Sequence, residues 1–249
     1  MGLAHRIVPV ILCKGRMQVK GRQFNSWRSV GIAEQAMRVH AMRQVDEVVL
    51  LDIAATKEGR TIDLGLVESL AQSLYTPLAV GGGVRSIEDV RALLKAGADK
   101  VVIGAAAFLQ DDFLGQCTDI VGSQAIVASV DVKGNGVFVN AGSMQAFANA
   151  ESAAESVAAE GAGEILLTSI EREGMMCGYD LDLIRRVSDA VDIPVIAHGG
   201  CGSYQHMVEA IQAGAHAVAA GAFFQFCDAS PLEAARFLQS NGIETRIPC

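Results

Sequence analysis

The sequence predicts a single (β/α)8 barrel over residues 1–249, and two observations lead to that prediction. First, the chain nearly repeats itself at a spacing of 117 residues, so that residues 77–86 (PLAVGGGVRS) match residues 194–203 (PVIAHGGCGS). Second, each half has room for four strand–helix units, and two halves therefore supply eight. An open doubly wound sheet is the alternative, but its GxGxxG fingerprint after the first strand is absent from the sequence.

Eight short apolar runs are the predicted strands, and their near-continuous hydrophobicity indicates burial on both faces. In chain order they span residues 7–12, 47–52, 77–80, 100–103, 125–130, 164–169, 194–197 and 217–220. Between them lie amphipathic stretches with helical spacing, such as residues 64–74. One helix is expected to open at Ser86, where Asp89 completes a capping box, and Ser203 occupies the same place in the second half.

Two connections are longer than a barrel needs. One runs from Cys13 to about Val30 after the first strand, and the other runs from Val132 to about Asn149 after the fifth. Within the second, residues 133–136 (KGNG) predict a hairpin turn. Long connections at the carboxyl ends of barrel strands are usually functional lids, so we expect both to cover a site.

Composition and charge exclude several classes of protein. A hydrophobic content of 51% is ample for a large core, and a net charge of −8 argues against nucleic acid as the main partner. The apolar run at the N-terminus is too short to span a membrane and has no signal-peptide layout, so we expect a cytoplasmic protein. The histidines do not cluster, and the cysteines form no CxxC pair, so the sequence implies neither a metal nor another cofactor. The cysteines are Cys13, Cys117, Cys177, Cys201, Cys227 and Cys249.

Glycines follow the predicted strands at equivalent places in the two halves. They are Gly82 and Gly83 after the third strand, Gly104 after the fourth, Gly199 and Gly200 after the seventh, and Gly221 after the eighth. Glycine lets the backbone approach a ligand closely, and the start of the next helix offers free N–H groups to an anion. The sequence therefore predicts two phosphate-binding cups that would hold a substrate with a phosphate at each end. The alternative is that these glycines only permit tight turns.

Several longer motifs resemble the HisF family, the cyclase subunits of imidazole glycerol phosphate synthase. They are RIVP (6–9), DEVVLLDI (46–53), VGGGVRSIEDVRALLKAGADKV (80–101), GSQAIVASVD (122–131) and GAGEILLTSIEREG (161–174). The resemblance covers essentially the whole chain. It implies a heterodimer with a HisH-like glutaminase, ammonia that passes through the barrel from its N-terminal face, and Gly174 as a further phosphate-binding residue.

Four charged residues each stand at the predicted start of a strand, and they are Arg6, Glu47, Lys100 and Glu164. From position alone, two cations and two carboxylates at the bottom of a barrel can neutralise one another and close its floor. In the HisF family a ring of four alternating charges guards the ammonia entrance, and the resemblance implies that role here. It also implies that Asp99 and Gln124 lie on the face that docks the glutaminase.

The resemblance implies an incomplete catalytic pair. In HisF, aspartates that end the first and fifth strands serve as general acid and base. Asp131 matches the second of these, although a cap on the following turn is its alternative role. Leu12 stands where the first aspartate belongs, and leucine can neither donate nor accept a proton. Lys20 in the first long connection and Asp52 at the end of the second strand are retained, and they are the remaining candidate catalytic residues.

Further departures from the family pattern lie at the ends of the strands. Glycine replaces an asparagine at Gly104 and a serine at Gly221, His198 replaces a serine, and Glu173 stands in place of an aspartate. The glycine-rich backbone of the cups remains, but several side-chain donors to phosphate are gone. His198 is either a substitute donor or a satisfied structural histidine.

Three functions follow from these features. The first is a HisF-like subunit that supports amidation of a nucleotide-sugar or surface-glycan precursor, from acetamido to acetamidino, with a separate ATP-dependent amidotransferase activating the sugar. The second is the cyclase of histidine biosynthesis, which converts ammonia and the bisphosphate PRFAR to imidazole glycerol phosphate and AICAR ribonucleotide. The third is a non-catalytic scaffold that activates the glutaminase. Retention of the floor charges, with Leu12 in place of one aspartate of the acid–base pair, favours the first.

Overall fold

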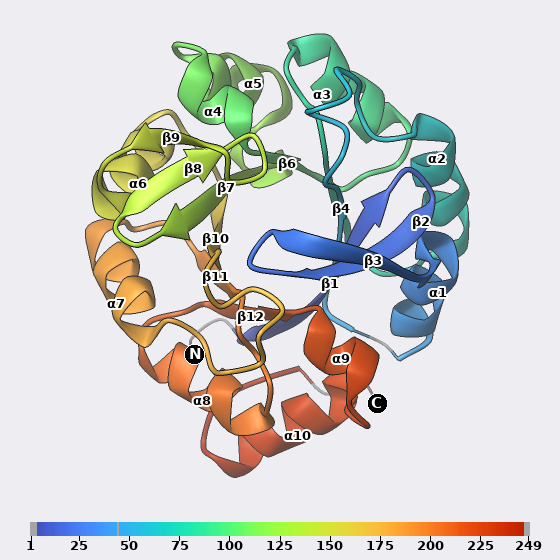
Figure 1. Ribbon diagram of the computed structural model, residues 1–249, viewed down its shortest axis with the longest axis vertical. Helices are drawn as coiled ribbons and strands as arrows, with labels where there is room; N and C mark the ends of the chain where they lie inside the picture. The colour runs from blue at the N-terminus through green and yellow to red at the C-terminus, as the bar shows by residue number, and fades with distance from the viewer. Residues whose placement is uncertain (1–3, 44, 247–249) are drawn as a thin grey trace.

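Eight parallel strands close into a barrel in the computed structural model, which describes residues 4–43 and 45–246 (Figure 1). In order around the barrel they are β1 (Arg6–Lys14), β4 (Val48–Asp52), β5 (Leu78–Gly81), β6 (Lys100–Ile103), β7 (Ile126–Lys133), β10 (Glu164–Ser169), β11 (Val195–His198) and β12 (Ala217–Ala220). Strand β7 pairs with β10, and β12 pairs with β1, so the ring has no open edge. The predicted (β/α)8 barrel and its eight strands are confirmed.

Helices surround the barrel on the outside, as Figure 1 shows. They are α1 (Ala33–Met42), α2 (Leu64–Ser73), α3 (Ile87–Lys95), α4 (Ala105–Leu109), α5 (Phe113–Val121), the 3-10 turn η1 (Ser123–Ala125), α6 (Ala150–Ala159), α7 (Leu181–Ala190), α8 (Tyr204–Gln212), α9 (Ala222–Phe226) and α10 (Pro231–Ser240). Ser86 and Asp89 form the predicted capping box at the start of α3. Ser203 caps α8 by accepting from the backbone N–H of His206. Among the residues that the structure describes, no helix is long and apolar enough to cross a membrane.

The internal repeat is visible in the element boundaries. Four pairs of helices have first and last residues that are each 117 positions apart, and they are α1 and α6, α2 and α7, α3 and α8, and α4 and α9. Strands β5 and β11, and β6 and β12, keep the same offset. The duplication read from the sequence is therefore a duplication of structure, with α1 to α4 of the first half repeated as α6 to α9 of the second.

The two long connections are hairpins that lie over the open end of the barrel (Figure 1). We expected the first to be a loop, and that expectation is wrong, because it folds into β2 (Met17–Arg22) and β3 (Asn25–Ile32). Strand β2 folds back antiparallel on β1, which extends past the barrel rim to Lys14. The second connection contains β8 (Gly136–Val139) and β9 (Met144–Phe147). Its predicted turn is confirmed, since Lys133 pairs with Gly136 and Gly134 takes a φ of 60°.

Alternate residues of each barrel strand point into the barrel, where they form an inner apolar cluster separate from the core beneath the helices. The inner cluster consists of Val8, Val10, Leu12, Val19, Val49, Ala79, Val102, Val127, Leu166, Ile196, Ala217 and Ala219. The same alternation places the first residue of β1, β6 and β10 inside at the N-terminal end. The interior is therefore charged at its floor and apolar through its middle, with polar side chains reappearing at the mouth.

Candidate functional site

The four charges at the floor form a closed ring of ion pairs. Arg6 contacts Glu47 at 2.5 Å and Glu164 at 3.1 Å. Lys100 contacts the same two carboxylates at 2.9 Å and 3.0 Å. Each cation thus bridges both anions, and the side chains are largely withdrawn from solvent, with Glu47 only 2% exposed. The structure brings together all four residues that the sequence singled out.

Asp99 and Gln124 lie at the same end of the barrel as this ring. Asp99 immediately precedes β6, and its carboxylate accepts a hydrogen bond from the backbone N–H of Leu78 at 2.8 Å. Gln124 lies in η1, just before β7, and is exposed. Both residues are therefore placed on the N-terminal face, where a partner that covers the floor would reach them.

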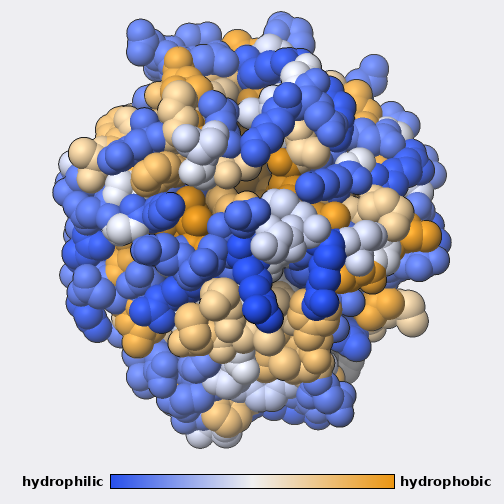
Figure 2. Space-filling model, in the orientation of Figure 1, coloured by the Kyte–Doolittle hydropathy of each residue, from blue (hydrophilic) through white to orange (hydrophobic). Residues whose placement is uncertain are grey.

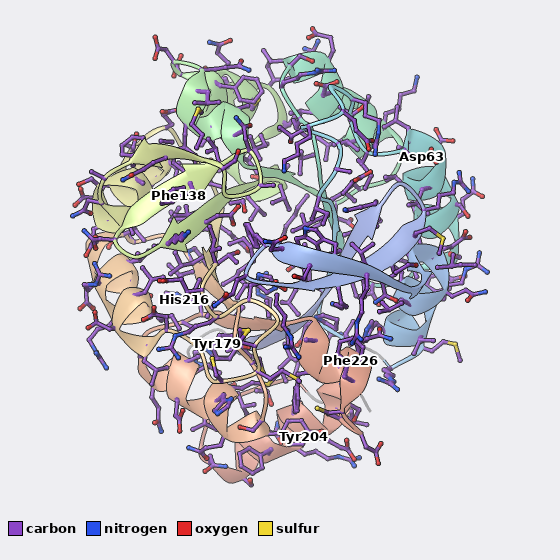
Figure 3. The ribbon with its side chains drawn as sticks, viewed as in Figure 1. Asp63, Phe138, Tyr179, Tyr204, His216 and Phe226 are labelled. Atoms are coloured by element: carbon purple, nitrogen blue, oxygen red, sulfur yellow. The ribbon has the colours of Figure 1, made fainter. Side chains whose placement is uncertain are left out.

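A cavity of about 130 Å³ opens at the other end, the mouth of the barrel. In Figure 2 it is a hollow near the centre of the face, with apolar residues in its wall. The two hairpins contribute aromatic side chains to it, Trp27 from β3 and Phe138 from β8, the latter labelled in Figure 3. Leu12 and Asp131 line the same cavity. The resemblance to HisF predicts a carboxylate at position 12, and an apolar side chain stands there instead.

Asp131 is the half-buried carboxylate of this cavity. It lies within β7 and not at its end as predicted, because the strand continues to Lys133 to pair with the second hairpin. Burial raises the pKa of Asp131 to about 6, an effect that hydrogen bonds from Thr168 and Ser129 oppose. A carboxyl group with that pKa exchanges protons readily near neutral pH, as a general acid or base requires.

The raised pKa of Asp131 predicts a pH-dependent gain in stability for Asp131→Asn. Because the folded-state pKa lies above the ordinary 3.8, the wild-type fold loses stability as the pH rises from about 4 through about 6. Asparagine does not titrate, so the variant is expected to be about 1–3 kcal/mol more stable than wild type at pH 8 and nearly equal at pH 4. Urea unfolding at the two pH values measures the difference. An equal difference in stability at pH 4 and pH 8 would contradict the raised pKa of Asp131.

Lys20 and Glu173 form a second titratable pair beside the mouth. Lys20 is 3% exposed on β2, and its Nζ donates to the carbonyl of Val10 at 3.3 Å. Burial lowers the pKa of Lys20 to about 8, although Glu173 opposes the shift. Burial also raises the pKa of Glu173 to about 7, and its Oε2 has no hydrogen-bond partner among the described residues. The Lys20 Nζ lies against Gly221, and a Cβ added there would lie 2.5 Å from it.

Asp52 is engaged in holding local structure. Its side chain is fully buried and accepts hydrogen bonds from the backbone N–H groups of Gly15 at 3.2 Å and Ala54 at 3.0 Å. It also forms an ion pair with Arg60 at 2.7 Å. Although Asp52 lines the mouth cavity, these bonds tie the end of β4 to the first hairpin and leave the carboxylate few free lone pairs.

The glycines of the two predicted cups differ in what surrounds them. An added Cβ would meet backbone at 1.8 Å from Gly83, 2.2 Å from Gly174 and 2.1 Å from Gly200, so close packing alone requires glycine there. Gly82 and Gly199 take φ angles of 132° and 89°, and an added Cβ would lie 2.8 Å from the backbone oxygen of Asp52 and 2.7 Å from that of Ser169.

The first cup is open and the second is nearly filled. Gly104 borders the mouth cavity, and Gly83 lines an adjoining pocket of about 180 Å³ together with Arg60 and Arg85. Gly221 belongs to the second cup, whose cavity of about 10 Å³ has room for about one water molecule. The two cups are therefore not equivalent as anion sites.

The sequence did not predict that one row of polar side chains lies together at the mouth. Thr168 on β10 pairs laterally with Asp131 on β7 and with His198 on β11. The Thr168 Oγ1 lies 3.2 Å from the His198 Nδ1, and Ser129 donates to Asp131 at 3.3 Å. His198 was noted as a substitution, but Thr168 was missed. The alternation of Glu164, Leu166 and Thr168 along one strand was the signal, because it places the threonine inside the barrel.

Among the described residues, no group of three or more His, Cys, Asp or Glu side chains has the arrangement of a metal site. The thiols of Cys13, Cys117, Cys177, Cys201 and Cys227 are free. Cys249 lies outside the described residues.

Fold and site together define a class: a two-fold repeated (β/α)8 barrel with a floor of paired charges and a polar site at the carboxyl ends of its strands. A family model described as histidine biosynthesis protein matches residues 6–229. The chain is also 40% identical over 250 residues to the imidazole glycerol phosphate synthase subunit HisF of Dictyoglomus turgidum, an alignment that covers 98% of this chain and 99% of that protein. The chain belongs to the HisF family of histidine biosynthesis proteins.

Proposed function

We propose that this chain is the synthase subunit of a glutamine-dependent pair. It takes ammonia that a HisH-like glutaminase releases at the floor of the barrel and delivers it to an acceptor at the mouth. The observation that carries this proposal is the closed ring of Arg6, Glu47, Lys100 and Glu164 directly below an apolar interior. Ammonia is small and uncharged, so an apolar passage admits it. The same passage excludes ions, because a charge is costly to bring into apolar surroundings.

The glutaminase is proposed to dock on the N-terminal face, around Asp99 and Gln124. Asp99 borders a surface groove of about 340 Å³, and Tyr75 beside it is fully exposed. A tyrosine with its whole ring in solvent, next to a carboxylate and a concave surface, is the kind of residue that anchors protein interfaces. The name of the relative, a synthase subunit, agrees with a partnership of this kind.

The acceptor is proposed to be amidated and not cyclised. Cyclisation in HisF uses two titrating groups across the mouth, and Leu12 removes one of them. A nucleotide-sugar or glycan precursor activated by a separate ATP-dependent amidotransferase needs only delivery of ammonia, and an apolar Leu12 is compatible with that. The nearly filled second cup favours an acceptor without a phosphate at each end.

The cyclase of imidazole glycerol phosphate synthase is the second candidate. Identity of 40% to a HisF subunit over the full chain favours it. So do Lys20 and Glu173, a buried pair whose pKa values of about 8 and about 7 suit proton transfer. In this case the open first cup would hold one phosphate of the bisphosphate PRFAR, and the second cup would have to widen.

One assay separates the two candidates. The purified chain is supplied with a high concentration of ammonium salt and PRFAR, and loss of the substrate's absorbance is followed. We expect no turnover by the wild-type chain. Turnover that vanishes in Asp131→Asn would overturn the amidation proposal and establish the cyclase. In a parallel reaction, nitrogen-15 ammonium, ATP, the activating amidotransferase and a nucleotide-linked acetamido sugar are combined, and the expected product carries the heavy nitrogen.

A further inference from the structure

The first polar groups above the apolar section of the barrel lie on one side of its mouth. Residues 166 on β10 and 196 on β11 are apolar and belong to the inner cluster, and two positions further along these strands stand Thr168 and His198. On β7 the same step leads from Val127 to Ser129 and then to Asp131. The opposite wall is lined by Leu12, Leu51 and Val102. A molecule that moves up the barrel therefore meets its first hydrogen-bonding side chains on these three strands.

His198 occupies the junction of two cavities. It lines both the mouth cavity and the small cavity of the second cup, while the residue as a whole is 7% exposed. Its Nδ1 is taken by Thr168 at 3.2 Å. Its Nε2 has no hydrogen-bond partner among the described residues, and it is not sealed from solvent. The free nitrogen of a buried imidazole thus reaches the space at the top of the barrel.

The neighbours of His198 decide which form of the ring is stable. Burial and the nearby Lys20 ammonium lower the pKa of His198 to about 3, so the imidazole is neutral at physiological pH. Glu173 shares the second cavity with His198, and the buried Lys20 ammonium acts on that carboxylate as an opposite charge. On the other side Thr168 lies opposite Asp131 in the register of β10 and β7, and its hydroxyl lowers the pKa of that carboxyl as a hydrogen-bond donor does. An ionised carboxylate accepts and cannot donate. The hydroxyl hydrogen of Thr168 therefore goes to Asp131, and Thr168 accepts from the Nδ1–H of His198.

This order of hydrogen bonds leaves the His198 Nε2 as a lone-pair acceptor. An acceptor at this position suits an uncharged ligand with N–H groups. The Lys20 ammonium disfavours a cation there, so neutral ammonia is favoured over ammonium. A weakly basic nitrogen also holds ammonia without taking its proton, and ammonia keeps the lone pair that makes it a nucleophile.

We propose that Thr168, His198 and Asp131 form the reception site for ammonia at the top of the barrel, a role that rests on the proposed function. The His198 Nε2 accepts an N–H from ammonia, and Asp131 is the group that takes the released proton. In the reaction, the ammonia lone pair forms a C–N bond with the carbon of the acetamido group, whose oxygen the activating amidotransferase has linked to phosphate, and the C=N pair of that carbon moves to the sugar nitrogen. Asp131 accepts one N–H proton. The pair on the sugar nitrogen then re-forms the C=N bond as the C–O bond breaks, and Asp131 returns the proton to the oxygen that leaves with its phosphate. Thr168 is a positioning residue that fixes the orientation of His198.

Nitrogen NMR of the full chain labelled with nitrogen-15 histidine tests the site, with His198→Gln used to assign the resonance. We expect a neutral His198 with the proton on Nδ1. Thr168→Val is expected to move that proton to Nε2 in most molecules, and Thr168→Ser is expected to restore it. A proton on Nε2 in the wild-type chain, or an imidazolium at neutral pH, would overturn the proposal.

The second measurement adds ammonium chloride at alkaline pH, where free ammonia is present, and compares it with potassium chloride at equal ionic strength. We expect the His198 Nε2 resonance to shift with ammonium only, and the shift to disappear in Thr168→Val. Equal shifts with both salts, or none, would overturn the reception site even if the proton lies on Nδ1. Neither result depends on the acceptor, so failure of the proposed function is detected separately, in the turnover assays.

Discussion

The Leu12→Asp variant is expected to convert PRFAR in ammonium salt at least about 100-fold faster than the background rate, above which the wild-type chain is not expected to rise. Leu12 lies on the inner face of β1, is 4% exposed and lines the cavity that also holds Asp131. A carboxylate there would share the mouth with Asp131 and restore two titrating groups. Initial rates followed by absorbance measure the gain, and the pH profile of the variant is expected to be bell-shaped.

The matched control is Leu12→Asn, which has nearly the same shape and polarity but does not titrate. It is expected to remain at the wild-type level, and Asp131→Asn in the Leu12→Asp background is expected to abolish the gain. Equal activation by Leu12→Asn would show that polarity and not proton transfer was limiting. Absence of turnover in all variants that fold would mean that the mouth no longer binds the bisphosphate, in agreement with the nearly filled second cup.

Lys100→Met is expected to be the most destabilising single substitution considered, at about 3–5 kcal/mol. Lys100 is the bridge between Glu47 and Glu164, with contacts of 2.9 Å and 3.0 Å. Without it, two inward carboxylates share Arg6 alone, and one of them is 2% exposed. Urea unfolding at neutral pH measures the loss.

Lys95→Met is the matched control, since Lys95 is exposed in the last turn of α3 and forms no ion pair among the described residues. It is expected to change the free energy of unfolding by less than about 0.5 kcal/mol. If Lys100→Met proves equally mild, the floor charges are solvated by water and do not form a ring of mutual pairs. The entrance proposed here would then lack its structural basis.

The barrel and its floor were predictable because they follow from local patterns. Each strand is a short apolar run, and the four charges of the floor precede such runs. The first hairpin was not predictable by the same reasoning. Strand β2 buries Gln18 and Lys20 beside Val19, so it shows no alternation of apolar and polar residues that would mark a strand. Contacts with β1 and with the mouth stabilise it, and these are invisible in the sequence.

The polar row at the mouth was beyond prediction for a different reason. Asp131, Thr168 and His198 are separated by at least 30 residues in the chain, and only the lateral register of β7, β10 and β11 aligns them. Sequence also cannot tell why a glycine stands at a turn. Gly83 and Gly200 matched a phosphate-binding pattern, yet the backbone packed against them would exclude any side chain regardless of ligand.

The ring at the floor distributes its charges unequally between the two repeated halves. Its carboxylates, Glu47 and Glu164, are equivalent positions of the repeat, whereas both cations belong to the first half. The positions that correspond to Arg6 and Lys100 in the second half are Ser123 and Ala217. A barrel built from two first halves would carry excess positive charge at its floor, and one built from two second halves would bury carboxylates without cations. Only two unlike halves give a neutral floor. The two repeats therefore depend on each other for charge balance, although most of their helices begin and end at equivalent residues.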